Sequence, residues 1–322
     1  MERIGKTIAE TVRATLPPTW KTCVWIVEIT AAVSAGILMM RYLGILPLVS
    51  DALAPFFRLF GLPGEAAMAY VSGYFVNVYS AIAVAVAMEM GPREMTILAI
   101  MVLTSHNMIV ETAVQKKTGT SAVRMVLLRT LSGLFLGMLM NLLLPGGGRD
   151  AAPSAGIAAG GDFMGLFVPW LKDTALLLSK MVVIIFSLNI LQALLAEFGV
   201  IRAISRFLRP LLKVFGLPPR CSFLWIIANT VGLAYGAAAM IDETRKSKIT
   251  GYDIDLLNTH IAVSHSNVED IALFASVGAL WWAVLLSRVL WAVLMVWCYR
   301  LWHNIRNKFI SLQVPDSSGG NL

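Results

Sequence analysis

The most constraining feature of this chain is a series of long apolar stretches. Six of them approach the roughly 20 residues that a bilayer-crossing helix needs. They lie at 22–43, 94–115, 121–144, 172–197, 253–275 and 277–299. Only 14% of the residues are charged and the mean hydropathy is +0.74, whereas about a quarter of a soluble protein is charged. The sequence therefore predicts an all-α polytopic membrane protein.

The basic residues lie mainly beside these apolar stretches. The net charge is +7, but basic flanks of membrane spans are orientation signals, so we expect no nucleic-acid partner. The three cysteines are scattered and fit neither a disulfide framework nor a metal motif. Residues 1–20 show neither the apolar core nor the cleavage site of a signal peptide. They predict an amphipathic interfacial helix that stops at Pro17-Pro18.

A polar motif interrupts two of the apolar stretches. Its first copy is Ser-His-Asn-Met-Ile-Val-Glu at residues 105–111, and its second is Ser-His-Ser-Asn-Val-Glu-Asp at 264–270, displaced by 159 residues. Residues 44–63 also align without a gap with residues 199–218, and both segments end in Phe-Gly-Leu-Pro. These correspondences predict that the chain contains two copies of one unit.

A broken apolar stretch follows each Gly-Leu-Pro sequence, at 64–90 and 220–241. The first contains Asn77 and Tyr79, and the second contains Asn229 and Tyr235, in each case together with Gly. Such residues indicate an interrupted helix, which membranes tolerate only where the backbone is buried in protein or lines a wet cavity. We expect each stretch to form a re-entrant helical hairpin.

The distribution of positive charge predicts how the two units are oriented. If the broken stretches are re-entrant, the units are inverted, and if they cross the membrane, the units are parallel. With a cytoplasmic N-terminus, the inverted arrangement keeps Lys116, Lys117 and the basic block at 202–220 inside, whereas the parallel arrangement exports them. We therefore predict two inverted-topology repeats, an arrangement that secondary transporters use to build a site at the repeat interface.

This order of elements, over residues 44–130 and 199–290, resembles the Gate (nucleoside-recognition) family of membrane proteins. The family includes the membrane part of ferrous-iron transport protein B, the concentrative nucleoside transporters, and spore maturation proteins A and B. The resemblance implies two inverted units around a central pathway. The sequence lacks the GxxxxGK[ST] motif of a GTP-binding domain, so the resemblance implies the architecture more firmly than the substrate.

The resulting plan divides the chain into five parts. They are an amphipathic N-terminus at 1–20, Gate repeat 1 at 21–145, a flexible linker at 146–162, Gate repeat 2 at 163–300 and a C-terminal tail at 301–322. Each repeat is expected to contain an amphipathic helix, a re-entrant hairpin and transmembrane helices.

The repeated motif supplies the candidate site residues. On one continuous helix, His265 and Glu269 would share a face. Asn107 and Glu111 would do the same, whereas His106 would point about 140° away from Glu111. Imidazole together with carboxylate suits Fe²⁺, Mn²⁺ or Zn²⁺. The same groups also suit hydrogen bonding to a nucleoside or another polar solute, or a proton relay.

Residues predicted to bind or move a substrate are His106, Asn107, Glu111, His265, Asn267, Glu269, Asp270, Asn77, Tyr79, Asn229 and Tyr235. Candidate metal ligands among them are His106, Glu111, His265 and Glu269. Arg129 and Arg288, also 159 residues apart, are predicted to form structural ion pairs. Arg129 would pair with Glu111, and Arg288 with Asp270 or Glu269.

We predict a multi-pass protein of the bacterial inner membrane that moves a small solute, with a divalent cation such as ferrous iron as the first choice. The alternatives are a nucleoside-like solute, or a non-transporting partner or sensor subunit. A transporter needs a polar cavity open to one side, whereas a scaffold would seal both histidines. No enzyme motif such as HExxH is present. Expected partners are the bilayer, the solute or metal, and a second copy or partner subunit, with no certain cofactor.

Overall fold

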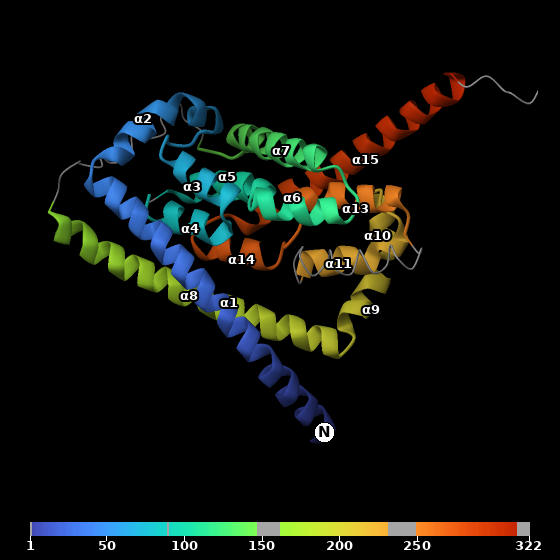
Figure 1. Cartoon of the computed structure of the whole chain (residues 1–322), viewed down its shortest axis with the longest axis horizontal. Helices are drawn as coiled ribbons and strands as arrows, with labels where there is room; N and C mark the ends of the chain where they lie inside the picture. Colours follow the sequence, from blue (N-terminus) through green and yellow to red (C-terminus); the bar gives the residue numbers. More distant parts are fainter. Residues whose placement is uncertain (1, 89, 147–161, 231–248, 314–322) are drawn as a thin grey trace, which may run out of the picture.

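The computed structural model describes residues 2–88, 90–146, 162–230 and 249–313. These residues form α-helices and two short 3₁₀ helices, arranged around a central group of helices (Figure 1). The first part of the chain forms α1 (Glu2–Tyr42), α2 (Ile45–Phe57), η1 (Arg58–Phe60), α3 (Ala66–Phe75), α4 (Val78–Val86), α5 (Pro92–Ser105), α6 (Met108–Lys117) and α7 (Ala122–Leu143). The second part forms α8 (Phe163–Glu197), α9 (Val200–Phe207), α10 (Arg209–Val214), η2 (Pro219–Cys221), α11 (Ser222–Thr230), α13 (Gly251–Val263), α14 (Glu269–Ser276) and α15 (Trp281–Gln313).

Five helical segments among the described residues are long and apolar enough to cross a membrane. They are Ile4–Tyr42, Pro92–Lys117, Ala122–Leu143, Phe163–Glu197 and Trp281–Phe309. The prediction of an all-α, multi-pass membrane protein is therefore confirmed. The apolar stretch at 253–275 is not among the five, because the gap between its two helices, from Val263 to Glu269, is wider than the gap from Ser105 to Met108 within the Pro92–Lys117 segment.

The predicted stop at Pro17-Pro18 is wrong, because α1 continues through both prolines to Tyr42. Proline inside a helix costs about 3 kcal/mol, so other contacts must offset it. Just beyond the prolines, Thr19 of α1 lies 3.4 Å from the Asn189 amide of α8. The two helices pack against each other along much of their length (Figure 1). This packing provides the physical reason for an uninterrupted α1.

Helices α3 and α4 pack against each other and are joined through Val76 and Asn77. They contain 10 and 9 residues, so each is about 15 Å long or slightly less. That is half of the roughly 30 Å hydrocarbon core, so neither helix can cross a membrane alone. In the second part, α11 occupies the position after Gly-Leu-Pro, and the expected continuation at 231–241, including Tyr235, lies outside the described residues.

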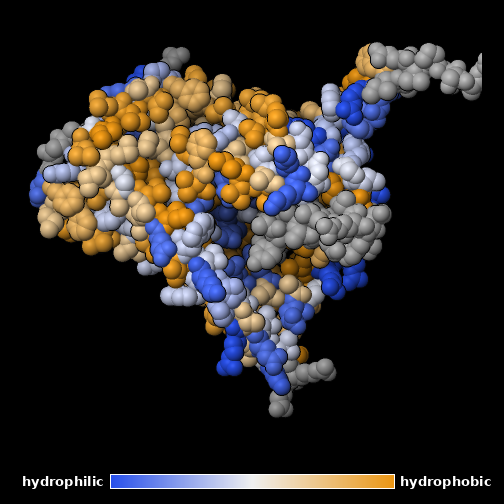
Figure 2. All heavy atoms as spheres, in the orientation of Figure 1, coloured by the Kyte–Doolittle hydropathy of each residue, from blue (hydrophilic) through white to orange (hydrophobic). Residues whose placement is uncertain are grey.

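The centre of the molecule is built on α5. In the most apolar 18 residues of the Pro92–Lys117 segment, 72% of the residues are buried. The corresponding share in the other four candidate spans is 22–33%. Helices α1, α8 and α15 therefore present much of their surface to the surroundings. Figure 2 shows apolar side chains spread over the face that carries α2 and α7, as expected for contact with lipid.

Candidate functional site

Both copies of the polar motif break their helices at the same point. Helix α5 ends at Ser105, His106 is extended, and Asn107 has a left-handed backbone with φ 48° before α6 begins. In the second copy Ser266, 159 residues after Asn107, also has φ 48°. Among the described residues, these are the non-glycine residues with positive φ. Such strain is uncommon and concentrates at functional sites.

The two breaks are stabilised by equivalent backbone hydrogen bonds. The Asn107 N–H donates to the Gly73 carbonyl at 2.8 Å, and the Ser266 N–H donates to the Ala228 carbonyl at 3.2 Å. Gly73 belongs to α3 and Ala228 to α11, the two helices that follow the Gly-Leu-Pro sequences. The broken stretches predicted from sequence therefore contact the histidine motifs directly in both parts of the chain.

The breaks bring side chains from the two motifs together. His106 Nε2 lies 3.0 Å from Glu111 Oε1, and His265 Nε2 lies 3.2 Å from the same oxygen. The Asp270 Oδ2 atom lies 3.8 Å from His106 Nε2. The imidazole ring centroids are 5.1 Å apart. All four residues are buried, with His106 5% and His265 1% exposed. We call these four residues the central cluster.

The helix-face expectation for this motif is wrong. It assumed continuous helices, on which His106 and Glu111 diverge while His265 and Glu269 align. Because α5 and α6 are separate, His106 and Glu111 contact each other. Glu269 instead accepts a hydrogen bond from Tyr79 at 2.7 Å, and Asp270 joins the histidines.

The hydrogen bonds of the central cluster assign the protons on both imidazoles. His106 Nδ1 lies 3.2 Å from the Leu103 carbonyl, and His265 Nδ1 lies 2.7 Å from the Ile261 carbonyl. A carbonyl oxygen can only accept, so we assign the proton of each neutral ring to Nδ1. In a neutral ring each Nε2 then directs its lone pair at Glu111, which is also an acceptor, so a proton on Nε2 or a cation between the groups is needed to make these contacts favourable. The Arg129 guanidinium contacts the other Glu111 oxygen, Oε2, and a bound cation would supply the positive charge between the two Nε2 atoms and Oε1.

The spacing of the acceptors fits a metal ion. Ligand atoms about 2.1 Å from a tetrahedrally coordinated metal lie about 3.4 Å from one another. The closest ligand atoms of His106, His265 and Asp270 all lie within 4.8 Å of one another. Metal-binding histidines usually donate their other ring N–H to a carbonyl or carboxylate. Leu103 and Ile261 provide these carbonyls. Sequence reasoning missed them, although free carbonyls at helix ends are a general signal.

Arg129 holds the first break and contacts the central cluster. It is fully buried, and it donates from Nε to the Thr104 carbonyl at 3.2 Å and from Nη2 to the His106 carbonyl at 2.6 Å. Its Nη2 also lies 2.8 Å from Glu111 Oε2. The structure therefore places Arg129 next to the carboxylate with which the sequence paired it.

Arg288 holds the second break in the same way but without a carboxylate. It donates from Nε to the Val263 carbonyl at 3.1 Å and from Nη2 to the His265 carbonyl at 3.0 Å. Its Nη2 also reaches the Leu103 carbonyl of the other motif at 2.9 Å. No carboxylate of the described residues lies within 4 Å of Arg288, so the pairing with Asp270 or Glu269 expected from sequence is not formed.

The remaining predicted residues surround the central cluster. Asn77 caps α4 by accepting from the Ser80 N–H at 2.8 Å. The Asn267 amide donates to Asn229 Oδ1 at 2.7 Å, while its own oxygen accepts from Arg288 at 3.0 Å. These amides therefore position backbone and Arg288 rather than contacting the histidines.

Comparison with known proteins agrees with this architecture. The family model named Gate, described as nucleoside recognition, matches residues 23–143. This range contains the first histidine motif and Arg129. The chain is also 30% identical over 246 residues to the Uncharacterized membrane protein YvoD of Bacillus subtilis (strain 168), covering 76% of this chain and 79% of that protein. No solved structure matches the chain. The chain belongs to the Gate (nucleoside recognition) family of membrane proteins.

Proposed function

We propose that this protein transports a divalent metal cation, such as ferrous iron, through the central cluster. The observation that carries the proposal is the convergence of two imidazole Nε2 atoms on one Glu111 oxygen, at 3.0 and 3.2 Å. Two nitrogen ligands with carboxylate oxygens form a set of intermediate softness, which suits Fe²⁺, Mn²⁺ or Zn²⁺. Charged groups buried in a membrane protein commonly mark an ion pathway.

A metal fits the cluster better than a nucleoside does. Pockets for small organic ligands usually enclose about 300 Å³ or more and carry apolar or aromatic walls. Here the ligand atoms of three residues lie within 4.8 Å of one another, which leaves room for an ion between them. The nucleoside alternative is suggested both by the hydrogen-bonding side chains of the motif and by the description of the family, and it requires the two motifs to move apart.

Two inverted repeats are the architecture that we propose for this transporter. Support comes from contacts that recur at fixed spacings. Arg129 and Arg288 bind equivalent carbonyls 159 residues apart, and the glycines at 44 and 199 both have left-handed backbones. Helices α3 and α4 are each too short to span a membrane, as expected for the two arms of a re-entrant hairpin. The positive charges of the sequence favour inversion rather than parallel repeats.

In this proposal each half contributes one imidazole and one carboxylate to the ion. The arginines keep the broken helices in place, because they satisfy carbonyls that the interrupted ladder leaves free. Both histidines are buried, which is the arrangement that we expected from the sequence for a non-transporting scaffold. A transporter with this site must therefore also adopt a conformation in which the cluster opens to one side, as alternating access requires.

Reconstitution tests the proposal. Purified protein in liposomes should take up Fe²⁺, Mn²⁺ or Zn²⁺ down a gradient, and His106→Ala/His265→Ala should abolish the flux. His303→Ala is the matched control, since His303 lies on α15 far along the chain from both motifs. Uridine uptake without metal uptake would favour the nucleoside alternative. Metal binding without flux of either solute would favour a partner or sensor subunit.

A further inference from the structure

A cavity of about 250 Å³ lies between α1, α2, α4 and α8, away from the central cluster. Its apolar wall includes Ile37, Leu38, Leu46, Val86, Leu166 and Leu177. Its polar wall consists of Ser34, Arg41, Trp170, Asp173 and Thr174. Trp170 Nε1 donates to Ser34 Oγ at 2.8 Å, and Ser34 and Thr174 hydroxyls are 3.3 Å apart. The cavity lining thus combines apolar side chains with hydrogen-bonding ones.

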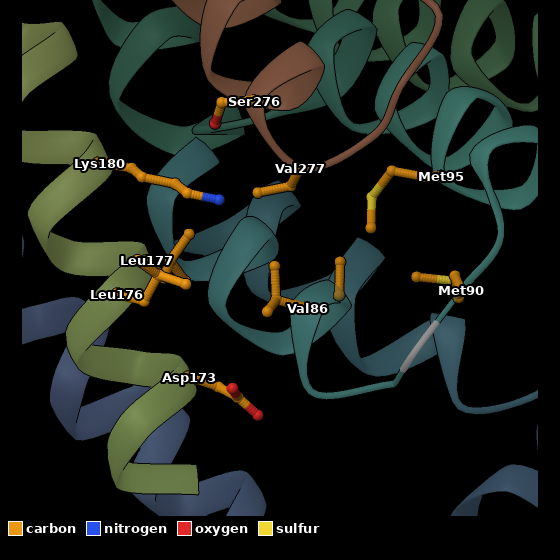
Figure 3. A pocket seen from close by; sticks show the side chains of 10 residues that line it. Val86, Met90, Met95, Asp173, Leu176, Leu177, Lys180, Ser276 and Val277 are labelled. Carbon is orange, nitrogen blue, oxygen red and sulfur yellow. The ribbon is translucent and has the colours of Figure 1, made fainter. Parts of the chain in front are cut away.

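A second cavity of about 200 Å³ adjoins the first. The two share Val86, Asp173 and Leu177 as lining residues. Figure 3 shows Asp173 and Lys180 extending from α8 toward the space bordered by Val86 and the α14 end. Asp173 therefore lies where the two cavities meet.

The charges of the first cavity have no ionic partner among the described residues. Arg41 Nε is buried without a hydrogen-bond partner. No ion pair within 4 Å joins Arg41 to Asp173, and neither residue forms an ion pair with another described residue. Charged side chains within a membrane protein normally pair with each other or with backbone. The partly buried Arg41 and the exposed Asp173 therefore line a single cavity, and neither has an ionic partner among the described residues.

The position of this cavity favours a ligand that arrives from the bilayer. It lies between α1 and α8. In the most apolar 18 residues of these helices, only 33% and 22% of the residues are buried. Exposed apolar side chains lie on or directly beside these helices, namely Met39 on α1, Leu43 just after its end, and Val168 and Leu171 on α8. An amphiphile can place its chains on this surface while its polar end enters the cavity.

We propose that this cavity binds the headgroup of a phospholipid that carries both a phosphate and a primary amine, of the phosphatidylethanolamine class. The phosphate would accept from the Arg41 guanidinium, which suits phosphate oxygens. The ammonium would donate to Asp173, since a primary amine offers N–H donors. A quaternary choline has none and is bound instead by aromatic cages. The acyl chains would lie on the apolar surface of α1 and α8.

Native mass spectrometry of the purified full-length protein tests this inference. Phosphatidylethanolamine, phosphatidylcholine and phosphatidylglycerol with identical acyl chains are titrated separately. The wild type should bind phosphatidylethanolamine about tenfold more tightly than either other lipid, as expected for one charge-assisted hydrogen bond. Asp173→Asn should remove this preference, whereas Arg41→Gln should weaken binding of all three lipids. Asp51→Asn and Arg58→Gln, which alter exposed charges outside both cavities, are the matched controls.

Several results would overturn the inference. Equal affinities of the wild type for the three lipids would overturn it. This measurement needs no variant, so the test remains decisive even if a variant fails to fold. An Asp173→Asn protein that keeps the preference, or an Asp51→Asn control that loses it, would also contradict the site. Binding of soluble phosphoethanolamine without binding of the lipid would identify a free solute as the ligand.

Discussion

Arg129 and Arg288 occupy equivalent positions but differ in their charge partners. Both are fully buried and both bind two carbonyl groups at the end of a broken helix. Arg129 also pairs with Glu111 at 2.8 Å, whereas Arg288 donates to the Asn267 side chain at 3.0 Å. Removing one member of a buried pair leaves an uncompensated charge, while removing both does not.

We expect Arg129→Gln to lower the free energy of unfolding by about 3–5 kcal/mol, because Glu111 remains buried without its cation. Arg129→Gln/Glu111→Gln should recover part of that loss. The control is Arg288→Gln with Glu111→Gln, for which we expect no recovery. Unfolding in mixed detergent micelles measures all of these variants. A double variant no more stable than Arg129→Gln would contradict the buried pair.

At the residue scale, sequence reasoning found the important side chains but not all of their contacts. The shared spacing of Arg129 and Arg288 singled them out, and the same spacing identified both histidines. It could not place His106 against Glu111, because two residues five positions apart on a continuous helix point in different directions. The contact depends on a left-handed residue at 107, and no hydrophobic pattern encodes that backbone angle.

The broken helix is the element on which the site depends. Each break has one non-glycine residue at φ 48°, Asn107 in the first motif and Ser266 in the second. The left-handed conformation costs an L-residue about 1–2 kcal/mol, and asparagine tolerates it better than most residues. Sequence analysis expected continuous spans here, because the apolar pattern runs through both motifs without a proline or glycine.

Substitution at the breaks tests their geometry. Asn107→Gly and Ser266→Gly should retain full stability, because glycine adopts positive φ freely. Asn107→Val and Ser266→Val should each lower the free energy of unfolding by about 1–2 kcal/mol or more. Thermal unfolding in detergent provides the measurement. Valine variants as stable as the glycine variants would show that the backbone at these positions is not left-handed.

Two left-handed glycine turns give a second test at this scale, Gly61 before the broken stretch at 64–90 and Gly199 at the start of α9. Gly61 and Gly199 both have positive φ, 64° and 70°. A Cβ at Gly61 would collide with the Asn141 side chain, whereas at Gly199 nothing lies within 4 Å. Gly61→Ala should therefore cost clearly more than the 1–2 kcal/mol of backbone strain expected for Gly199→Ala. Equal losses of stability, measured by the same unfolding assay, would contradict the close packing of Gly61.

The whole molecule brings the two parts of the chain together at one point. Helices α5 and α6 from the first part meet α13 and α14 from the second, and Glu111 contacts a histidine from each. The sequence predicted the repeated motif and the membrane class from spacing and hydropathy. It could not predict that a carboxylate would be shared between the motifs, because that contact depends on how the parts pack.

Topology labelling tests the inverted arrangement. In a background without Cys23, Cys221 and Cys298, single cysteines are placed at Lys116 and Lys213. Inverted repeats put both positions in the cytoplasm, so a membrane-impermeant maleimide should label neither in intact cells and both after lysis. Labelling of both positions in intact cells would support parallel repeats, and labelling of only one would contradict the inverted arrangement.

The metal content of the purified protein tests the central claim most directly. We expect about one divalent ion per chain in the wild type after exposure to Fe²⁺, Mn²⁺ or Zn²⁺, since the four side chains of the central cluster form one site. His106→Ala/His265→Ala should lose that ion while His303→Ala keeps it. A wild type that retains none of the three metals, or a double variant that retains as much as the wild type, would contradict the account.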